Sequence, residues 1–137
     1  MKKKNSKKLI TTCVSDLKDK YKNREILIQG DDITLKVDET LISMAISNLI
    51  ENALKYSEDE IIVNISNNSI NIIDKGIGIE EKELEKINQK FYRISNNGWN
   101  NSLGLGLFIV QSVLSLHSFT LKISSEFKKG SQFCINY

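Results

Sequence analysis

The sequence predicts an α+β fold in which helices cover one face of a single mixed β-sheet. Segments with helical and with strand-like apolar spacing are interleaved along 137 residues, without the regular β-α-β alternation of a parallel sheet. A chain of this length supports one hydrophobic core. Its 40% hydrophobic and 26% charged residues are typical of a globular domain, and it lacks the run of about 18 apolar residues that spans a membrane.

The clearest element is a helix over residues 39–55. Leu41, Ala45 and Leu49 recur at a spacing of four, as do the apolar residues at 42, 46, 50 and 54, which places them on one helical face. Asp38 precedes this segment as an N-cap. Further helices are expected at residues 9–17, 80–87 and 104–116, and strands at 26–28, 34–37, 61–65, 70–73, 119–125 and 132–136.

Two hairpins are expected among these strands. Gly30 and the aspartates after it form a turn signal, so residues 34–37 are predicted to pair with residues 26–28. Asn67 and Asn68 mark the turn of the second hairpin.

The charge is unevenly distributed. Five of the 19 basic residues are lysines in the first eight positions, so the rest of the chain carries 14 basic and 17 acidic residues. A nucleic-acid-binding face needs clustered basic residues, so no nucleic-acid partner is expected. We expect residues 1–8 to be a solvated leader, or a junction to another domain, ahead of a domain at residues 9–137. Cys13 and Cys134 stand far apart, which argues against a zinc site and indicates a reducing compartment.

Two asparagines interrupt the apolar pattern of the 39–55 helix. Asn48 and Asn52 lie four residues apart and Lys55 continues the stripe, so the three side chains share a face. Asparagine is a poor residue for a helix interior, but its amide oxygen can bind Mg²⁺ and a lysine can bind phosphate. A solvent-facing polar stripe explains the same pattern.

Two glycine-containing segments suit a ligand as well as a turn. Asp74 ends a predicted strand just before Gly76 and Gly78, where its carboxylate can accept a hydrogen bond and the glycines let the backbone approach a planar ligand. Gly104 and Gly106 open a predicted helix, where free backbone amides can bind phosphate. A tight turn and a closely packed helix are the alternative interpretations.

The asparagine-rich segment at residues 91–103 is predicted to be a loop. Arg93 at its root is placed to reach a phosphate, whereas Phe91 is equally a core anchor. His117 is the only histidine and lies where a helix ends, so we expect it to be structural.

The order of these motifs resembles that of sensor histidine kinases over about residues 9–137. Five segments are similar, in chain order, to the N box, the first glycine box, the F box, the second glycine box and the closing G-[ST]-x-F strand: residues 48–57, 74–78, 91–93, 104–110 and 130–133. The resemblance implies the Bergerat fold, a two-layer α/β sandwich that binds ATP between the long helix and a lid, here residues 91–103.

The resemblance also implies the roles of individual residues in an Mg²⁺–ATP site. Asn52 would be the Mg²⁺ ligand, Lys55 would bind phosphate and Asp74 would accept the adenine amino group. Asn48 would stand where ATP-hydrolysing relatives such as gyrase carry a glutamate base, and because an amide cannot deprotonate water, ATP would be kept for phosphoryl transfer. The other implied nucleotide contacts are Tyr56, Gly76, Gly78, Ile79, Phe91, Arg93, Gly104, Leu105, Gly106 and Leu107.

Three features depart from the family pattern. Residues 100–102 replace the glycine that usually precedes the second glycine box, and Ser118 and Phe119 replace the glycines that usually follow the histidine. No H-E-x-x-R phosphoacceptor helix is present, and His117 fits the turn position instead. The histidine that receives phosphate is therefore expected on another domain, N-terminal to this one.

The implied function is that of the catalytic domain of a two-component sensor kinase. It would transfer the γ-phosphoryl group of ATP to a histidine on a dimerisation domain, for relay to an aspartate of a response regulator. The isolated domain would be a monomer, and the parent kinase a homodimer in the bacterial cell membrane with this domain in the cytoplasm. Two alternatives stay open: an anti-sigma factor and serine kinase of the same fold, and an interaction module that binds no nucleotide.

Overall fold

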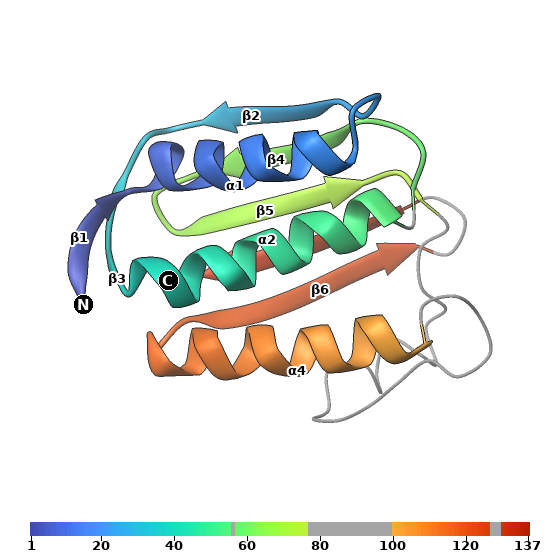
Figure 1. Cartoon of the computed structure of the whole chain (residues 1–137). Coiled ribbons are helices and arrows are strands. Elements are labelled where there is room, and N and C mark those ends of the chain that lie inside the picture. Colours follow the sequence, from blue (N-terminus) through green and yellow to red (C-terminus); the bar gives the residue numbers. More distant parts are fainter. Residues whose placement is uncertain (56, 77–99, 127–129) are drawn as a thin grey trace.

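Five strands form one mixed sheet in the order β2-β4-β5-β7-β6 (Figure 1). The structure is a computed structural model that describes residues 1–55, 57–76, 100–126 and 130–137. The strands β2 and β4 are parallel and the other neighbours are antiparallel. Their bounds are β2 Ile26–Gly30, β4 Ile61–Ile65, β5 Ser69–Asp74, β6 Thr120–Glu126 and β7 Gly130–Asn136. The predicted mixed sheet is confirmed.

Three described helices cover one face of this sheet: α1 (Ser6–Lys20), α2 (Glu39–Lys55) and α4 (Asn100–Leu116) (Figure 1). Helix α2 lies between the other two and packs over β5. Apolar side chains from α1, α2 and alternate strand positions fill the space between helices and sheet, because a strand turns every second side chain to the same face. The largest fully buried side chains are Phe133, Ile10, Ile42, Ile46, Leu49, Ile50, Leu54, Ile61, Ile65, Ile70 and Ile72.

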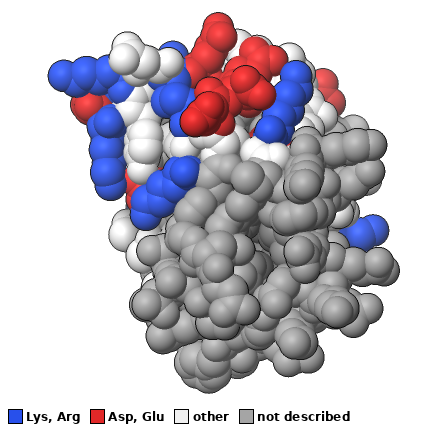
Figure 2. Space-filling model, turned by 90° about the vertical axis from the view of Figure 1, so that its right-hand side faces the viewer, with Lys and Arg blue, Asp and Glu red and all other residues white. Residues whose placement is uncertain are grey.

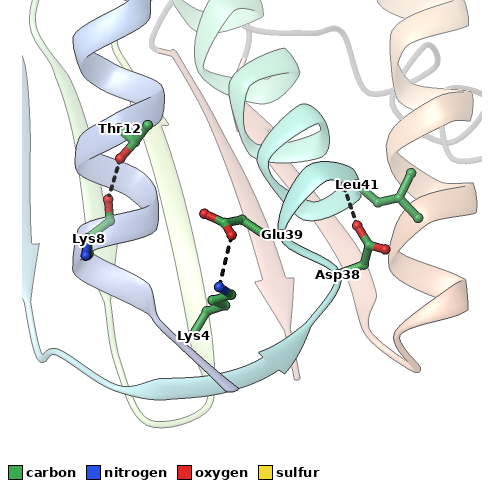
Figure 3. A network of polar contacts seen from close by, with 6 residues as sticks. All are labelled: Lys4, Lys8, Thr12, Asp38, Glu39 and Leu41. Carbon is green, nitrogen blue, oxygen red and sulfur yellow. Dashed lines mark hydrogen bonds and ion pairs between the residues drawn. The ribbon is translucent and has the colours of Figure 1, made fainter. Parts of the chain in front are cut away.

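Helix α2 has the predicted bounds. Its apolar residues at a spacing of four are buried except for Leu41, which is partly buried. The Asp38 side chain accepts a hydrogen bond from the Leu41 amide at 3.0 Å, which satisfies one of the unpaired amides of the first turn. Glu39 in that turn forms an ion pair with Lys4 at 3.0 Å (Figure 3). The acidic charge also suits the positive end of the helix dipole.

The predicted hairpin between residues 26–28 and 34–37 is wrong. The strand β3 (Thr34–Val37) pairs antiparallel with β1 (Lys2–Asn5) in a separate two-stranded ribbon, while β2 pairs with β4. Gly30 has a φ of 96°, and the chain leaves the sheet there. A four-residue alternation such as that of β3 specifies which side chains are buried but not which strand it pairs with.

The segment expected to be a solvated leader or a junction to another domain, residues 1–8, contains ordered elements. Residues 2–5 form β1, and α1 begins at Ser6. Ser6 exchanges hydrogen bonds with Ile33, through its backbone amide at 2.8 Å and its side-chain hydroxyl at 3.0 Å. The Asn5 side chain accepts a hydrogen bond from the Lys8 amide at 2.9 Å and so caps α1. The lysines of this segment therefore lie on an ordered strand and on the first turn of α1.

Helix α4 begins four residues earlier than predicted. Residues 100–103, expected to belong to the lid loop, form its first turn. The rest of that loop, residues 91–99, and the expected helix at 80–87 lie outside the described residues. Asparagine and serine favour caps and turns over helix interiors, so the sequence of this first turn indicates a loop rather than a helix.

The end of α4 forms a Schellman motif without glycine. The Phe119 amide bonds the Leu114 carbonyl at 2.8 Å and the Ser118 amide bonds the Ser115 carbonyl at 3.0 Å, the two bonds that define the motif. Ser118 takes the left-handed conformation, with a φ of 59°. The turn is therefore made by a serine that carries the strain of this conformation.

His117 is structural, as expected. It is buried, its Nε2 accepts a hydrogen bond from the Asp38 amide at 3.0 Å, and its Nδ1 lies 2.8 Å from the Val113 carbonyl oxygen. Because Nε2 is the acceptor, the ring proton is on Nδ1 and is donated to Val113. The ring thus ties the end of α4 to the start of α2.

Among the residues that the structure describes, no helix combines the length and the apolar character needed to cross a bilayer.

Candidate nucleotide site

The predicted site residues of α2 and β5 meet at one end of the domain. Both elements reach this end with their C-termini, β7 starts there, and α4 presents its N-terminal end (Figure 1). Asp74 of β5 pairs in register with Ser131 of β7. The sheet topology therefore brings together the segments that carry the N box and both glycine boxes.

Helix α2 supplies a buried amide at this end. Asn52 is only 5% exposed, and its Nδ2 atom has no hydrogen-bond partner within the described part of the chain. A buried polar group without a partner costs free energy. Because Nδ2 is a donor, an acceptor such as a phosphate oxygen would satisfy it, and only the amide oxygen of Asn52 could bind Mg²⁺. One turn away Asn48 is half-buried, and Lys55 at the end of the helix is exposed.

The last residue of β5 supplies a buried carboxylate. Asp74 is 6% exposed; its Oδ1 accepts a hydrogen bond from the Gly76 amide at 2.8 Å, and the Ser131 amide also bonds the carboxylate. Burial raises the pKa of Asp74 above its ordinary value, and the two amide hydrogen bonds oppose this rise. Two backbone donors hold the group while leaving acceptor capacity for an amino group.

Gly130 is required where β7 passes the backbone of Asp74. It has a φ of 127°, and a Cβ atom there would lie 2.2 Å from the Asp74 carbonyl oxygen. Any side chain at this position would displace the end of β5. The sequence analysis noted the motif at residues 130–133 but assigned no site role to Ser131, whose amide holds the carboxylate; the second position of that motif was the available signal.

The second glycine box lies inside α4, which corrects its expected place at a helix start. Unpaired amides belong to the first turn of a helix, and that turn is formed here by residues 100–103. Gly104, Leu105 and Gly106 follow it, so their amides lie within the helix. Leu107 is 1% exposed and belongs to the core.

Five other predicted nucleotide contacts lie outside the described residues: Tyr56, Gly78, Ile79, Phe91 and Arg93. Gly76, the first glycine of its box, is described, and its amide bonds Asp74.

The donors at this end suit a Mg²⁺–nucleotide rather than a metal held by the protein alone. Within the described ranges, no three His, Cys, Asp or Glu side chains gather into a metal-binding group. Mg²⁺ prefers oxygen ligands and is commonly bound through one or two protein groups together with phosphate oxygens. The buried Asn52 amide fits that requirement.

Residues 37–137 match the family model described as histidine kinase-, DNA gyrase B- and HSP90-like ATPase. The chain belongs to this ATPase family. The match begins at β3 and contains α2, Asp74 and both glycine boxes, so the buried amide and the buried carboxylate lie in the part of the chain that defines the family.

Curated relatives of this ATPase domain include sensor proteins. The phosphate regulon sensor protein PhoR of Pseudomonas aeruginosa is 36% identical over 113 residues, which are 77% of this chain and 26% of PhoR. The heme sensor protein HssS of Staphylococcus saprophyticus is 33% identical over 83% of this chain and 26% of HssS. The sensor-like histidine kinase SenX3 of Mycobacterium tuberculosis is 30% identical over 92% of this chain and 34% of SenX3. The chain thus spans about a quarter to a third of these relatives.

Solved structures show the same fold. A mycobacterial sensor histidine kinase, MprB, superposes with a TM-score of 0.79 at 22% identity, covering 98% of this chain and 94% of that one. The catalytic domain of histidine kinase ThkA in a nucleotide-free form superposes with a TM-score of 0.79 at 21% identity, covering 97% and 91%. The ATPase domain therefore has the Bergerat fold of histidine kinase catalytic domains.

Proposed function

We propose that this chain is the catalytic domain of a two-component sensor histidine kinase. It binds Mg²⁺–ATP and transfers the γ-phosphoryl group to a histidine on a separate dimerisation domain, which passes it to an aspartate of a response regulator. The observation that carries the proposal is the pair of buried polar groups, Asn52 and Asp74, at the same end of a domain of this ATPase family.

Asp74 recognises the adenine base in this proposal. Its carboxylate is held by the amides of Gly76 and Ser131, so it is oriented before the ligand arrives, and it accepts a hydrogen bond from the exocyclic amino group. Burial away from water strengthens this hydrogen bond. The base is bordered by Gly76, Gly78 and Ile79.

The C-terminal half of α2 recognises the phosphates. The Asn52 amide oxygen is a ligand for Mg²⁺, and Lys55 at the end of the helix binds phosphate oxygens, with Tyr56 beside the nucleotide. Bound Mg²⁺ neutralises charge on the phosphate oxygens. Asn48 cannot act as a base toward water, because an amide does not accept a proton at neutral pH, so ATP is kept for transfer to protein.

The remaining contacts come from the second glycine box and the lid. The amides of Gly104, Leu105 and Gly106 bind phosphate only after the first turn of α4 unwinds, because in α4 they lie beyond that turn. Leu107 anchors this segment in the core. Phe91 and Arg93 approach the nucleotide from the lid.

The proposed partners follow from the missing phosphoacceptor. His117 is buried and both of its ring nitrogens lie within hydrogen-bonding distance of backbone groups, so the acceptor histidine belongs to a dimerisation domain of the parent kinase. That parent is a homodimer in the bacterial cell membrane, with this domain in the cytoplasm.

Titration with a non-hydrolysable ATP analogue, with and without Mg²⁺, tests the nucleotide site while Trp99 fluorescence reports binding. We expect tighter binding with Mg²⁺. A separately produced phosphoacceptor domain is then added with radiolabelled ATP, and label is expected on its histidine. Failure of the analogue to bind contradicts the whole proposal and favours the interaction module, whereas binding without transfer contradicts the kinase activity alone. Binding to a sigma factor favours the anti-sigma factor and serine kinase instead.

A further inference from the structure

Arg24 ties the connection between α1 and β2 to the C-terminal end of α2. Its guanidinium donates hydrogen bonds to the Leu54 carbonyl oxygen, to the Ser57 hydroxyl at 3.1 Å and to the Asp59 carbonyl oxygen at 2.9 Å. The three acceptors lie 30 to 35 residues further along the chain. One side chain thus fixes three points of the segment that follows the N-box helix.

These contacts cap the C-terminal end of α2. The last carbonyl groups of a helix have no intrahelical donor. Arg24 supplies a donor to the carbonyl of Leu54, and the buried Ser57 donates its hydroxyl to the carbonyl of Ala53 at 2.8 Å. We call Arg24 and Ser57 the helix-end clamp.

The turn held by this clamp is the turn that carries the phosphate-binding residues. Asn52 and Lys55 flank the two carbonyl groups that Ser57 and Arg24 bind. The adenine-binding carboxylate is held differently: Asp74 is fixed by the amides of Gly76 and Ser131. The two halves of the site therefore have separate supports.

Charged side chains surround Arg24 at this end of the molecule. The hollow beside it, of about 440 Å³, is lined by Asn23, Glu25, Glu58, Asp59, Glu60 and Lys75 as well as Arg24. Figure 2 looks onto this end of the molecule and shows acidic and basic side chains gathered at its upper edge. Despite these acidic neighbours, the two terminal nitrogens of the guanidinium donate to two backbone carbonyls and one hydroxyl. The buried Nε of Arg24 has no hydrogen-bond partner within the described part of the chain.

We propose that Arg24 is a positioning residue for the phosphate and Mg²⁺ half of the nucleotide site. It acts through the last turn of α2, which it holds in the conformation that presents Asn52 and Lys55. The inference rests on the proposed function and deepens it. A lysine cannot replace Arg24, because a single ammonium group lacks the planar fork that reaches several acceptors.

The test compares two ligands in the wild-type chain and in Arg24→Lys. Affinity is measured for the Mg²⁺ complex of a non-hydrolysable ATP analogue and for adenosine, which lacks phosphates. Because Arg24→Lys keeps the charge but loses the fork, we expect affinity for the Mg²⁺ complex to fall about tenfold, the effect of one misplaced hydrogen-bonding group. Affinity for adenosine is expected to stay within about twofold.

A second variant and a matched control separate positioning from general destabilisation. Ser57→Ala removes the other half of the clamp and is expected to shift the ratio of the two affinities in the same direction. The control is Tyr137→Phe, which deletes a hydroxyl that donates to the Ser66 carbonyl at 2.6 Å, at the β4–β5 turn. We expect Tyr137→Phe to lower stability as well, but to leave the ratio of the two ligand affinities unchanged.

The outcomes distinguish this inference from the function on which it rests. If the wild-type chain does not bind the Mg²⁺ complex, the proposed function fails and the inference fails with it. A different result leaves the nucleotide site in place. If the wild type binds both ligands, and Arg24→Lys and Ser57→Ala leave the ratio of the two affinities unchanged, only the positioning role is wrong.

Discussion

At the scale of single residues, the candidate nucleotide site contains polar groups whose burial lowers the stability of the domain. Asp74 keeps a carboxylate at 6% exposure, and burial raises its pKa above the ordinary 3.8. A folded-state pKa above the unfolded value means that the folded protein binds the proton more readily, so the free energy of unfolding falls as pH rises through that window. The carboxylate is therefore better explained by recognition than by stability.

Asp74→Asn is expected to separate these two effects. The amide still accepts the Gly76 hydrogen bond but replaces one acceptor with a donor, so affinity for adenine nucleotides should fall about tenfold or more. Because asparagine does not titrate, the stability of the wild type relative to this variant should decrease as pH rises from about 4 through the raised pKa. Nucleotide titration and urea unfolding at several pH values measure both effects. A variant that binds as well as the wild type would refute the adenine role.

Asn52→Ala tests whether Asn52 binds Mg²⁺. The variant is expected to lose phosphoryl transfer and the Mg²⁺ dependence of nucleotide binding, while some binding without Mg²⁺ remains, because the proposed adenine contact at Asp74 is not altered. Nucleotide affinity with and without Mg²⁺ is the measurement. The control is Asn64→Ala, in β4 on the opposite face of the sheet from the buried Val63 and Ile65, which should leave the dependence unchanged. If Mg²⁺ dependence survives in Asn52→Ala, the metal is bound elsewhere.

At the scale of elements, the end of α4 holds strain that one substitution should relieve. Ser118 occupies the left-handed position of the Schellman motif with a φ of 59°. Ser118→Gly is expected to raise the free energy of unfolding by about 0.5–1 kcal/mol, because glycine reaches this conformation without a Cβ penalty. Chemical denaturation provides the measurement. Ser115→Gly is the matched control inside the same helix, where glycine should instead destabilise by about 0.5 kcal/mol. Equal effects at the two positions would refute the strain argument.

The predicted and observed elements agree where the sequence signal is local and differ where it is not. The bounds of α2 could be predicted because its apolar spacing and the Asp38 cap are local, and both are observed. The place of Asp74 at the end of β5 follows from local pattern in the same way. The partner of β3 could not be predicted, since its four residues alternate as any strand does. Arg24 was missed because its acceptors include backbone carbonyls about thirty residues away, for which no residue type is a signature.

At the scale of the whole molecule, the domain has a fold for binding nucleotide but presents no accessible histidine. His117, the only histidine in the chain, is 8% exposed and hydrogen-bonded to backbone groups of α2's cap and of α4. A nitrogen nucleophile must reach the γ-phosphate in line, and this ring does not.

The chain alone is therefore expected to remain unlabelled when it is incubated with radiolabelled Mg²⁺–ATP, and to label an added phosphoacceptor domain. Acid-labile, alkali-stable label on the added domain identifies phosphohistidine. Acid-labile label on this chain by itself would contradict the structural assignment of His117.

The parallel pairing of β2 with β4 is one of the long-range closures that this domain must make in order to fold. Ile26 meets Ile61 across the pair, so the register is completed only after the intervening chain, including all of α2, has been brought back over the sheet. Loop closure of this kind slows folding relative to the local β4–β5 and β6–β7 pairs. The pairing of β5 with β7 closes a still longer loop. Since the chain contains no proline, no prolyl isomerisation delays folding further, and a refolding experiment should report these long-range closures.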